Sequence, residues 1–214
     1  ITLHLPNEYK TYYFMLTAVD TRGLESVPTS EVSSAGALVV KIALNGGAAL
    51  TNNPTATIQL YAGGAAEMQF SNDNITWSAA EPFAATKAWP LSAGDGLKTV
   101  YARCKDAIGN WSTPVAAAIS LDTVRPVAAA TPLGQTYGTA QTVTLSSSES
   151  ATIYYTTDGT APITSSSVYQ NPLSIATDTN VRFFAVDPAG NVSAVQSQVY
   201  VIDMTGPTGS IAVN

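Results

Sequence analysis

A seven-residue turn sequence that recurs along the chain constrains the fold more than any other feature. It spans Asp106–Ser112 (DAIGNWS) and returns at Asp187–Ser193 (DPAGNVS), with a looser copy at Asp20–Ser26 (DTRGLES). Each copy follows a strand-like run that ends in a small residue and one further residue. The copies lie about eighty residues apart, which is the length of a small domain, so the chain is predicted to contain tandem domains that end in the same hairpin.

The composition narrows the class of protein. Hydrophobic residues make up 45% of the chain and charged residues only 11%, against about 25% charged in ordinary soluble domains. Small polar residues fill the difference, which is typical of β-rich extracellular modules. A net charge of −6 argues against binding to nucleic acid or insertion into an anionic membrane. The single cysteine excludes an internal disulfide, and bacterial export does not require one.

Alternating apolar and polar residues between turn signals predict β-strands along the whole chain and no amphipathic helix. The predicted strands are 38–44, 57–61, 67–71, 87–91, 98–105, 114–121, 141–147, 151–157, 168–175, 180–186 and 193–202. Short strands with turns every 8–12 residues or so indicate β-sandwiches. The predicted fold class is therefore all-β, with tandem immunoglobulin-like (Ig-like) and fibronectin-III-like antiparallel β-sandwiches joined by short linkers that contain Pro126 and Pro207.

Residues 126–206 carry the string Tyr154–Pro162 (YYTTDGTAP), followed by Tyr169 and by Pro172-Leu173. This segment resembles the chitobiase/β-hexosaminidase C-terminal-type Ig-like domain. The resemblance implies a non-catalytic β-sandwich of the kind appended to bacterial secreted enzymes and surface proteins.

Two further segments resemble known families. Residues 37–125 are similar to bacterial Ig-like repeats through Phe70–Ser78 and Trp89–Tyr101. Residues 1–36 resemble the C-terminal part of a fibronectin type III domain, because Leu5-Pro6 precedes the alternating run from Tyr12 to Asp20. Residues 207–214 are then expected to begin a further domain or to act as a donor strand, and both ends of the chain are expected to be truncated.

The turn aspartates have two interpretations. In the first, the carboxylate accepts backbone N–H groups of its own turn while Gly takes a positive φ. In the second, Asp106, Asp122, Asp187 and Asp203 are calcium ligands, since Ca²⁺ binds carboxylates and carbonyls of loops. The chain has no dense Asp-x-Asp spacing, which favours the structural interpretation and predicts no obligatory cofactor.

Aromatic residues in the turns offer a different kind of site. Trp77 and Trp111 lie in or beside turns of the 37–125 unit, where exposed rings could stack on sugars. Packing is the commoner use of such residues. Cys104 occupies the small-residue position before the turn, as Ala18 and Ala185 do in the other copies, and is expected to be a buried apolar side chain.

No motif for catalysis is present, so the chain is predicted not to be an enzyme. The favoured function is a structural or adhesive segment, such as a spacer, stalk or filament, of a large exported bacterial protein located outside the cell or on its surface. The alternative is a polysaccharide-binding accessory region of a secreted glycoside hydrolase. Expected partners are neighbouring domains of the same chain, copies of the chain through strand addition, or a polysaccharide.

Overall fold

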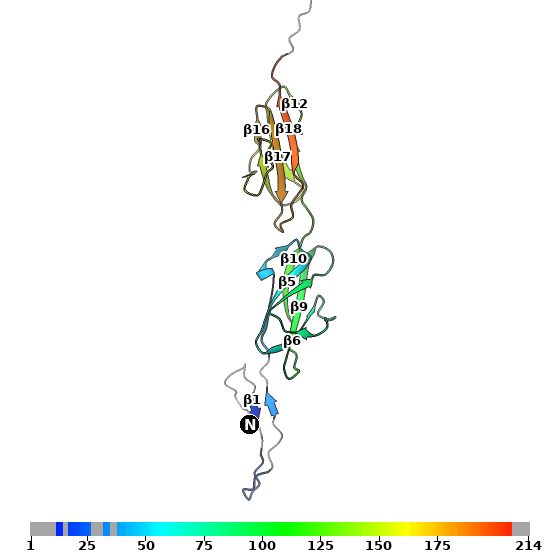
Figure 1. The fold of residues 1–214 in the computed structure, drawn as a ribbon, viewed down its shortest axis with the longest axis vertical. Coiled ribbons are helices and arrows are strands. Elements are labelled where there is room, and N and C mark those ends of the chain that lie inside the picture. The colour runs from blue at the N-terminus through cyan, green and yellow to red at the C-terminus, as the bar shows by residue number, and fades with distance from the viewer. Residues whose placement is uncertain (1–11, 15–16, 27–31, 35–37, 207–214) are drawn as a thin grey trace, which may run out of the picture. The chain divides into compact units, whose positions relative to one another are not determined.

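The fold is built almost wholly from β-strands. A computed structural model of the chain describes residues 12–14, 17–26, 32–34 and 38–206. Within these residues one helical turn occurs, the 3₁₀ helix Asn45–Gly47. No helix in the described part is long and apolar enough to cross a membrane. The all-β prediction is therefore confirmed, and each of the two sandwiches is described below by itself (Figure 1).

The first sandwich consists of a three-stranded and a five-stranded sheet. The three-stranded sheet has the order β3-β5-β8 and contains β3 (Val40–Leu44), β5 (Thr55–Ala62) and β8 (Thr86–Pro90). The five-stranded sheet has the order β4-β10-β9-β6-β7 and contains β4 (Leu50–Thr51), β10 (Val115–Leu121), β9 (Gly96–Asp106), β6 (Ala65–Ser71) and β7 (Glu81–Pro82). β5 pairs antiparallel with β3 and β8, and β6 pairs antiparallel with β7 and β9, whereas β4 and β10 are parallel.

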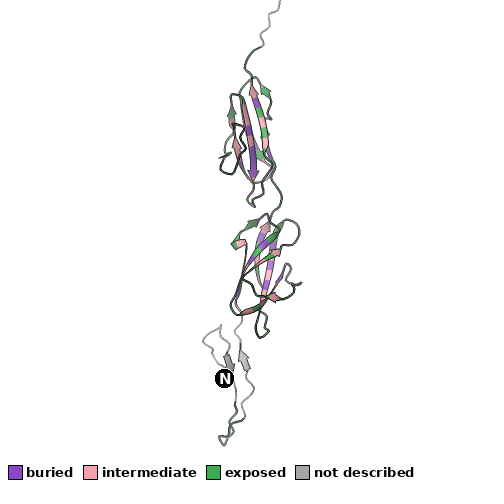
Figure 2. Cartoon of the chain, in the orientation of Figure 1, coloured by how far each residue is buried: buried purple, intermediate pink, exposed green. Residues whose placement is uncertain are grey.

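Inward-facing side chains, which occur at every second strand position, fill the core between these two sheets. Along β9, every second side chain from Val100 to Cys104 is fully buried, and along β5 Ala56 and Ile58 are fully buried (Figure 2). The Phe70 ring of β6 lies 5.4 Å from the Trp89 ring of β8, which joins the two sheets through the core. The period-two reading of these strands therefore identified the inward face.

The second sandwich repeats the arrangement. Its three-stranded sheet has the order β11-β13-β16 and contains β11 (Ala128–Thr131), β13 (Gln141–Ser147) and β16 (Leu173–Ile175). Its five-stranded sheet has the order β12-β18-β17-β14-β15 and contains β12 (Thr136–Tyr137), β18 (Gln196–Ile202), β17 (Thr179–Val186), β14 (Thr152–Thr156) and β15 (Ser167–Val168). The fully buried core residues are Val143, Val181, Phe183, Ala185 and Tyr200.

One predicted strand is wrong. The run 168–175 was expected to form a single strand, but it is divided between β15, which pairs with β14, and β16, which pairs with β13 of the other sheet. Pro172 lies between the two and cannot donate to a ladder, so the chain leaves one sheet before it enters the other.

The N-terminal segment is described only in part. Strands β1 (Tyr12–Phe14) and β2 (Val32–Ser34) pair antiparallel, and Val19 forms an isolated bridge with Glu25. Ala18 is exposed, whereas its counterparts Cys104 and Ala185 are fully buried. The small-residue position is therefore a core position only in the two sandwiches. The expected Leu5-Pro6 turn and the segment 207–214 lie outside the described residues.

Candidate functional site

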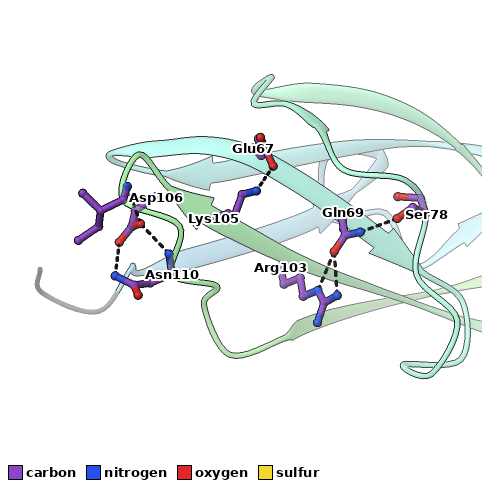
Figure 3. Close-up of polar contacts among 8 residues, drawn as sticks. Glu67, Gln69, Ser78, Arg103, Lys105, Asp106 and Asn110 are labelled. Atoms are coloured by element: carbon purple, nitrogen blue, oxygen red, sulfur yellow. Dashed lines mark hydrogen bonds and ion pairs between the residues drawn. The ribbon is translucent and has the colours of Figure 1, made fainter.

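The turn at Asp106 is a closed hydrogen-bond network of its own residues. Oδ1 of Asp106 accepts the backbone N–H groups of Ile108 at 3.0 Å and Asn110 at 2.8 Å, and Oδ2 accepts Nδ2 of Asn110 at 3.1 Å (Figure 3). Gly109 has φ of 98°, a value that L residues rarely adopt. The recurrent Asp, Gly and Asn residues therefore stabilise the conformation of the turn itself.

The second copy has the same bonds in a buried setting. Oδ1 of Asp187 accepts the N–H of Asn191 at 2.8 Å, and Oδ2 accepts Nδ2 of Asn191 at 2.8 Å. Nδ2 of Asn191 also donates to the backbone carbonyl of Asp122 at 2.8 Å. Asp187 and Asn191 are 5% and 7% exposed, respectively.

A serine closes each turn by a mechanism that the sequence did not reveal. The N–H of Ser112 donates to the carbonyl of Cys104 at 2.7 Å, and Oγ of Ser112 accepts the N–H of Cys104 at 3.1 Å. The same reciprocal pair joins Ser26 to Ala18, Ser78 to Phe70 and Ser193 to Ala185. The signal in the sequence is a serine eight residues after a strand residue, and one example, Ser78, lies outside the repeated turn.

The turn carboxylates are held ionised. Burial raises the pKa of Asp106, but the N–H donors of Asn110, Ile108 and Gly109 together lower it below its usual value. The same balance, with donors from Asn191, Gly190 and Ala189, lowers the pKa of Asp187. Both groups accept hydrogen bonds as carboxylates, which agrees with the structural interpretation of the turn.

The four aspartates considered as calcium ligands do not form one site. Asp122 and Asp187 come together with Glu149, and a carboxylate oxygen of each lies within 4.8 Å of the others. Asp203 instead accepts hydrogen bonds from Thr205, and Asp106 has its own turn as its partner. Three carboxylates could contribute ligands to a divalent cation, but Ca²⁺ needs six to eight or so oxygens. The rest would have to come from carbonyls and water.

Glu149 is the member of this trio that the sequence did not single out. It lies in a loop of serines and carries no motif. Burial, followed by the charges of Asp122 and Asp187, raises the pKa of Glu149. Three carboxylates so close together repel one another, and only the folded chain places them so.

Trp77 and Trp111 both contact one arginine, Arg103. The guanidinium carbon of Arg103 is 4.4 Å from the centroid of the Trp77 ring and 4.7 Å from that of Trp111. Nζ of Lys105 is 5.2 Å from the Trp111 ring. Trp77 is half-buried and Trp111 is 36% exposed. The two tryptophans therefore form one surface with Arg103. The sequence did not predict this surface, because Arg103 lies on β9 and Trp77 lies in the loop after β6.

Hydrogen bonds that involve Gln69 and Ser78 form a polar network that fixes the position of Arg103. Nε and Nη2 of Arg103 donate to Oε1 of Gln69 at 3.0 Å and 2.8 Å, and Nε2 of Gln69 donates to the carbonyl of Ser78 at 2.6 Å (Figure 3). Beside it, Lys105 forms an ion pair with Glu67. The ladder between β6 and β9 places Gln69 directly opposite Arg103.

Cys104 is a core residue, as predicted. It is fully buried, and this burial raises the pKa of its thiol to about 11. The thiol is therefore protonated at neutral pH and is not a nucleophile.

One family model matches part of the second sandwich. Residues 132–197 match the family model described as the chitobiase/beta-hexosaminidase C-terminal domain. This match confirms the resemblance assigned to 126–206 from the Tyr154–Pro162 string. No curated protein matches the chain.

Three solved structures align with the chain at low sequence identity and with TM-scores below 0.5. The fibronectin(III)-like modules of Clostridium thermocellum CbhA align with a TM-score of 0.48 and 13% identity over 81% of this chain and 100% of that chain. The D00-D0 domain of intimin gives a TM-score of 0.35 and 14% identity, covering 76% and 100%. A structure from a 1.5-MDa bacterial ice-binding adhesin aligns with a TM-score of 0.39 and 14% identity over 88% of this chain and 73% of that chain.

Proposed function

We propose that the chain is a non-catalytic structural or adhesive segment, such as a spacer or stalk, of an exported bacterial multidomain protein. We place it outside the cell or on the cell surface. The observation that carries this proposal is how the chain uses its reactive residue types. In both turns the Asp and Ser side chains accept backbone N–H groups and the Asn side chain donates to the Asp carboxylate. The one cysteine is a buried protonated thiol.

The family match supports the same conclusion. The family model that matches residues 132–197 is described as a C-terminal domain. Each of the two sandwiches contains an apolar core. Such domains fit a role as a stable spacer, which needs a stable fold and no reactive cleft.

Mechanical unfolding of single molecules tests the spacer role. Pulling the full chain from its ends should give two unfolding events, each lengthening the tether by about 25 nm, since a sandwich of some eighty residues unravels at roughly 3.4 Å per residue. The same preparation should hydrolyse neither chitin nor cellulose. A single low-force event, or turnover of a glycan, would contradict the proposal.

Self-assembly by strand addition is a further proposal for this segment. Strand β3 is an edge strand that pairs only with β5 among the described strands. Another copy could extend that sheet by main-chain hydrogen bonds. Sedimentation at increasing concentration tests this, and the replacement Ile42→Pro should abolish any association because proline removes a backbone donor.

The alternative, a polysaccharide-binding accessory region, is favoured by one observation. Trp77, Arg103 and Trp111 form a single surface on the outer side of the five-stranded sheet of the first sandwich. Binding of a polysaccharide at this surface would make the segment adhesive. The charge and the aromatic rings of the surface determine which class of polysaccharide it could bind.

A further inference from the structure

Arg103 occupies a position that the second sandwich fills differently. It lies three residues before Asp106 and faces Gln69, while Phe184 lies three residues before Asp187 and faces Tyr154. In the second sandwich the Tyr154 and Phe184 rings stack with centroids 5.4 Å apart, and Phe184 is 5% exposed. The fold therefore accepts an uncharged aromatic pair at this position and does not require a cation.

The charge of Arg103 has no carboxylate partner among the described residues. Its two hydrogen bonds both go to the neutral amide oxygen of Gln69. Two lysines of this sandwich do have carboxylate partners: Lys87 pairs with Glu81, and Lys105 pairs with Glu67. Partial burial of a cation costs hydration energy, which contact with the two indole rings offsets in part.

The guanidinium is held with one end available. Nε and one N–H of Nη2 are used by Gln69, while Nη1 has no hydrogen-bond partner in the described part of the chain and lies on the side away from Gln69 (Figure 3). The rings of Trp77 and Trp111 both lie against the guanidinium and restrain it, with their centroids 4.4 Å and 4.7 Å from its carbon atom. A side chain already ordered in this way loses little entropy when it binds.

We propose that Trp77, Arg103 and Trp111 form a binding surface for a uronic acid residue of an acidic polysaccharide. The free Nη1/Nη2 end of a guanidinium matches the two oxygens of a carboxylate. The flanking indoles supply apolar walls for the C–H faces of the pyranose ring that bears the carboxylate. A flexible acidic side chain of a protein offers no such ring, which favours the sugar acid.

The negative charge of the whole chain does not preclude this ligand. Charges farther than about 8 Å are largely screened at physiological salt, so the local cation decides the interaction. Glu67, which lies two residues before Gln69 on β6, forms an ion pair with Lys105 that offsets its charge. The proposal deepens the adhesive part of the proposed function and rests on it.

Calorimetric titration of the full chain with oligogalacturonate at 0.15 M or so of salt tests the proposal. Wild-type protein should bind oligogalacturonate and should not bind chito- or cello-oligosaccharides. Arg103→Gln should weaken binding by about tenfold to a hundredfold, the range for a hydrogen-bonded charge pair. Arg103→Lys should also weaken it, because lysine keeps the charge but loses the fork.

Two variants separate binding from folding. Lys41→Gln removes an exposed cation from the other sheet of the same sandwich and should leave binding unchanged. Gln69→Tyr with Arg103→Phe installs the pair of the second sandwich, so the melting temperature should remain within about 5 °C while binding is lost.

Several results would overturn the proposal. They are unchanged binding by Arg103→Gln, equal binding of neutral oligosaccharides, absence of oligogalacturonate binding, and stronger binding of a glutamate-rich peptide. Unfolding in two mechanical events would then still support the spacer role, so the two proposals can fail separately.

Discussion

The turns at Asp106 and Asp187 are the same local structure in two environments. In both, an aspartate accepts backbone and amide N–H groups of an asparagine four residues later. Around Asp106 these groups are largely solvated, since Asn110 is exposed. Asp187 and Asn191 are buried, and Asn191 has the carbonyl of Asp122 as a second acceptor.

The difference shows that the sequence of a turn does not by itself determine how much the turn contributes to the free energy of unfolding. Water can replace a lost partner at Asp106, whereas a lost partner at Asp187 leaves a buried group unsatisfied. The comparison can be tested in one molecule. All three tryptophans, Trp77, Trp89 and Trp111, lie in the first sandwich, so their fluorescence reports its unfolding alone, and circular dichroism reports both sandwiches.

The replacement of Asn191 by Ala should have the largest effect. It removes the donor to the buried Asp187 carboxylate and to the Asp122 carbonyl, so the second sandwich should lose about 2–3 kcal/mol of unfolding free energy. Asn110→Ala is the matched control and should cost the first sandwich under about 1 kcal/mol. Urea unfolding measures both, and equal losses would show that burial does not distinguish the turns.

The glycines of the two turns should behave alike. Gly109 and Gly190 have φ of 98° and 92°. Alanine at either position adopts an unfavourable backbone conformation at a cost of about 1–2 kcal/mol. This cost is local, so Gly109→Ala and Gly190→Ala should lower the two urea midpoints similarly. A cost confined to one sandwich would mean that the turn backbones differ in strain.

Acid should weaken both sandwiches through the same carboxylates. The pKa values of Asp106 and Asp187 are lowered in the folded chain. Their contribution to stability is therefore present above the usual carboxyl pKa near 4 and is lost as pH falls through the lower folded pKa. Unfolding at pH values from about 5 down to 2 should show this loss, and Asp106→Asn should reduce it in the fluorescence signal only.

Glu149 should give the second sandwich alone a pH dependence of stability that is opposite in sign to that of Asp106 and Asp187. This effect should be the smallest of those predicted. The folded pKa of Glu149 is raised, so stability is greater below the usual value and falls as pH rises through the folded pKa. Glu149→Gln should therefore stabilise the second sandwich at pH 7 in a chelating buffer and have no effect near pH 3. If the variant is destabilised at pH 7 without added cation, repulsion in the trio is not the dominant effect. A larger gain from added Ca²⁺ in the wild type than in this variant would indicate that the trio holds an ion.

Much of the fold follows from the sequence alone. Alternation along 98–105 and 180–186 determined which side chains of β9 and β17 face the core, because a strand presents successive residues to opposite faces. Phe184 is the exception to burial by alternation, since it is buried on the opposite face of β17 against Tyr154. The recurrent Asp, Gly and Asn residues determined where the last hairpin of each sandwich turns. The string Tyr154–Pro162 determined the family resemblance of the second sandwich, which the match over 132–197 confirms.

Only the tertiary structure decided how residues distant in sequence combine. The crossing between sheets at Pro172 depends on which neighbours β15 and β16 find. The pairing of β6 with β9 places Gln69 opposite Arg103, and the loop after β6 places Trp77 over it. Folding likewise brings Glu149 to Asp187, and it buries one repeated turn while it leaves the other in water. Such groupings arise from packing between residues that are far apart in the sequence. Residue order and periodicity describe only local structure and therefore do not predict them.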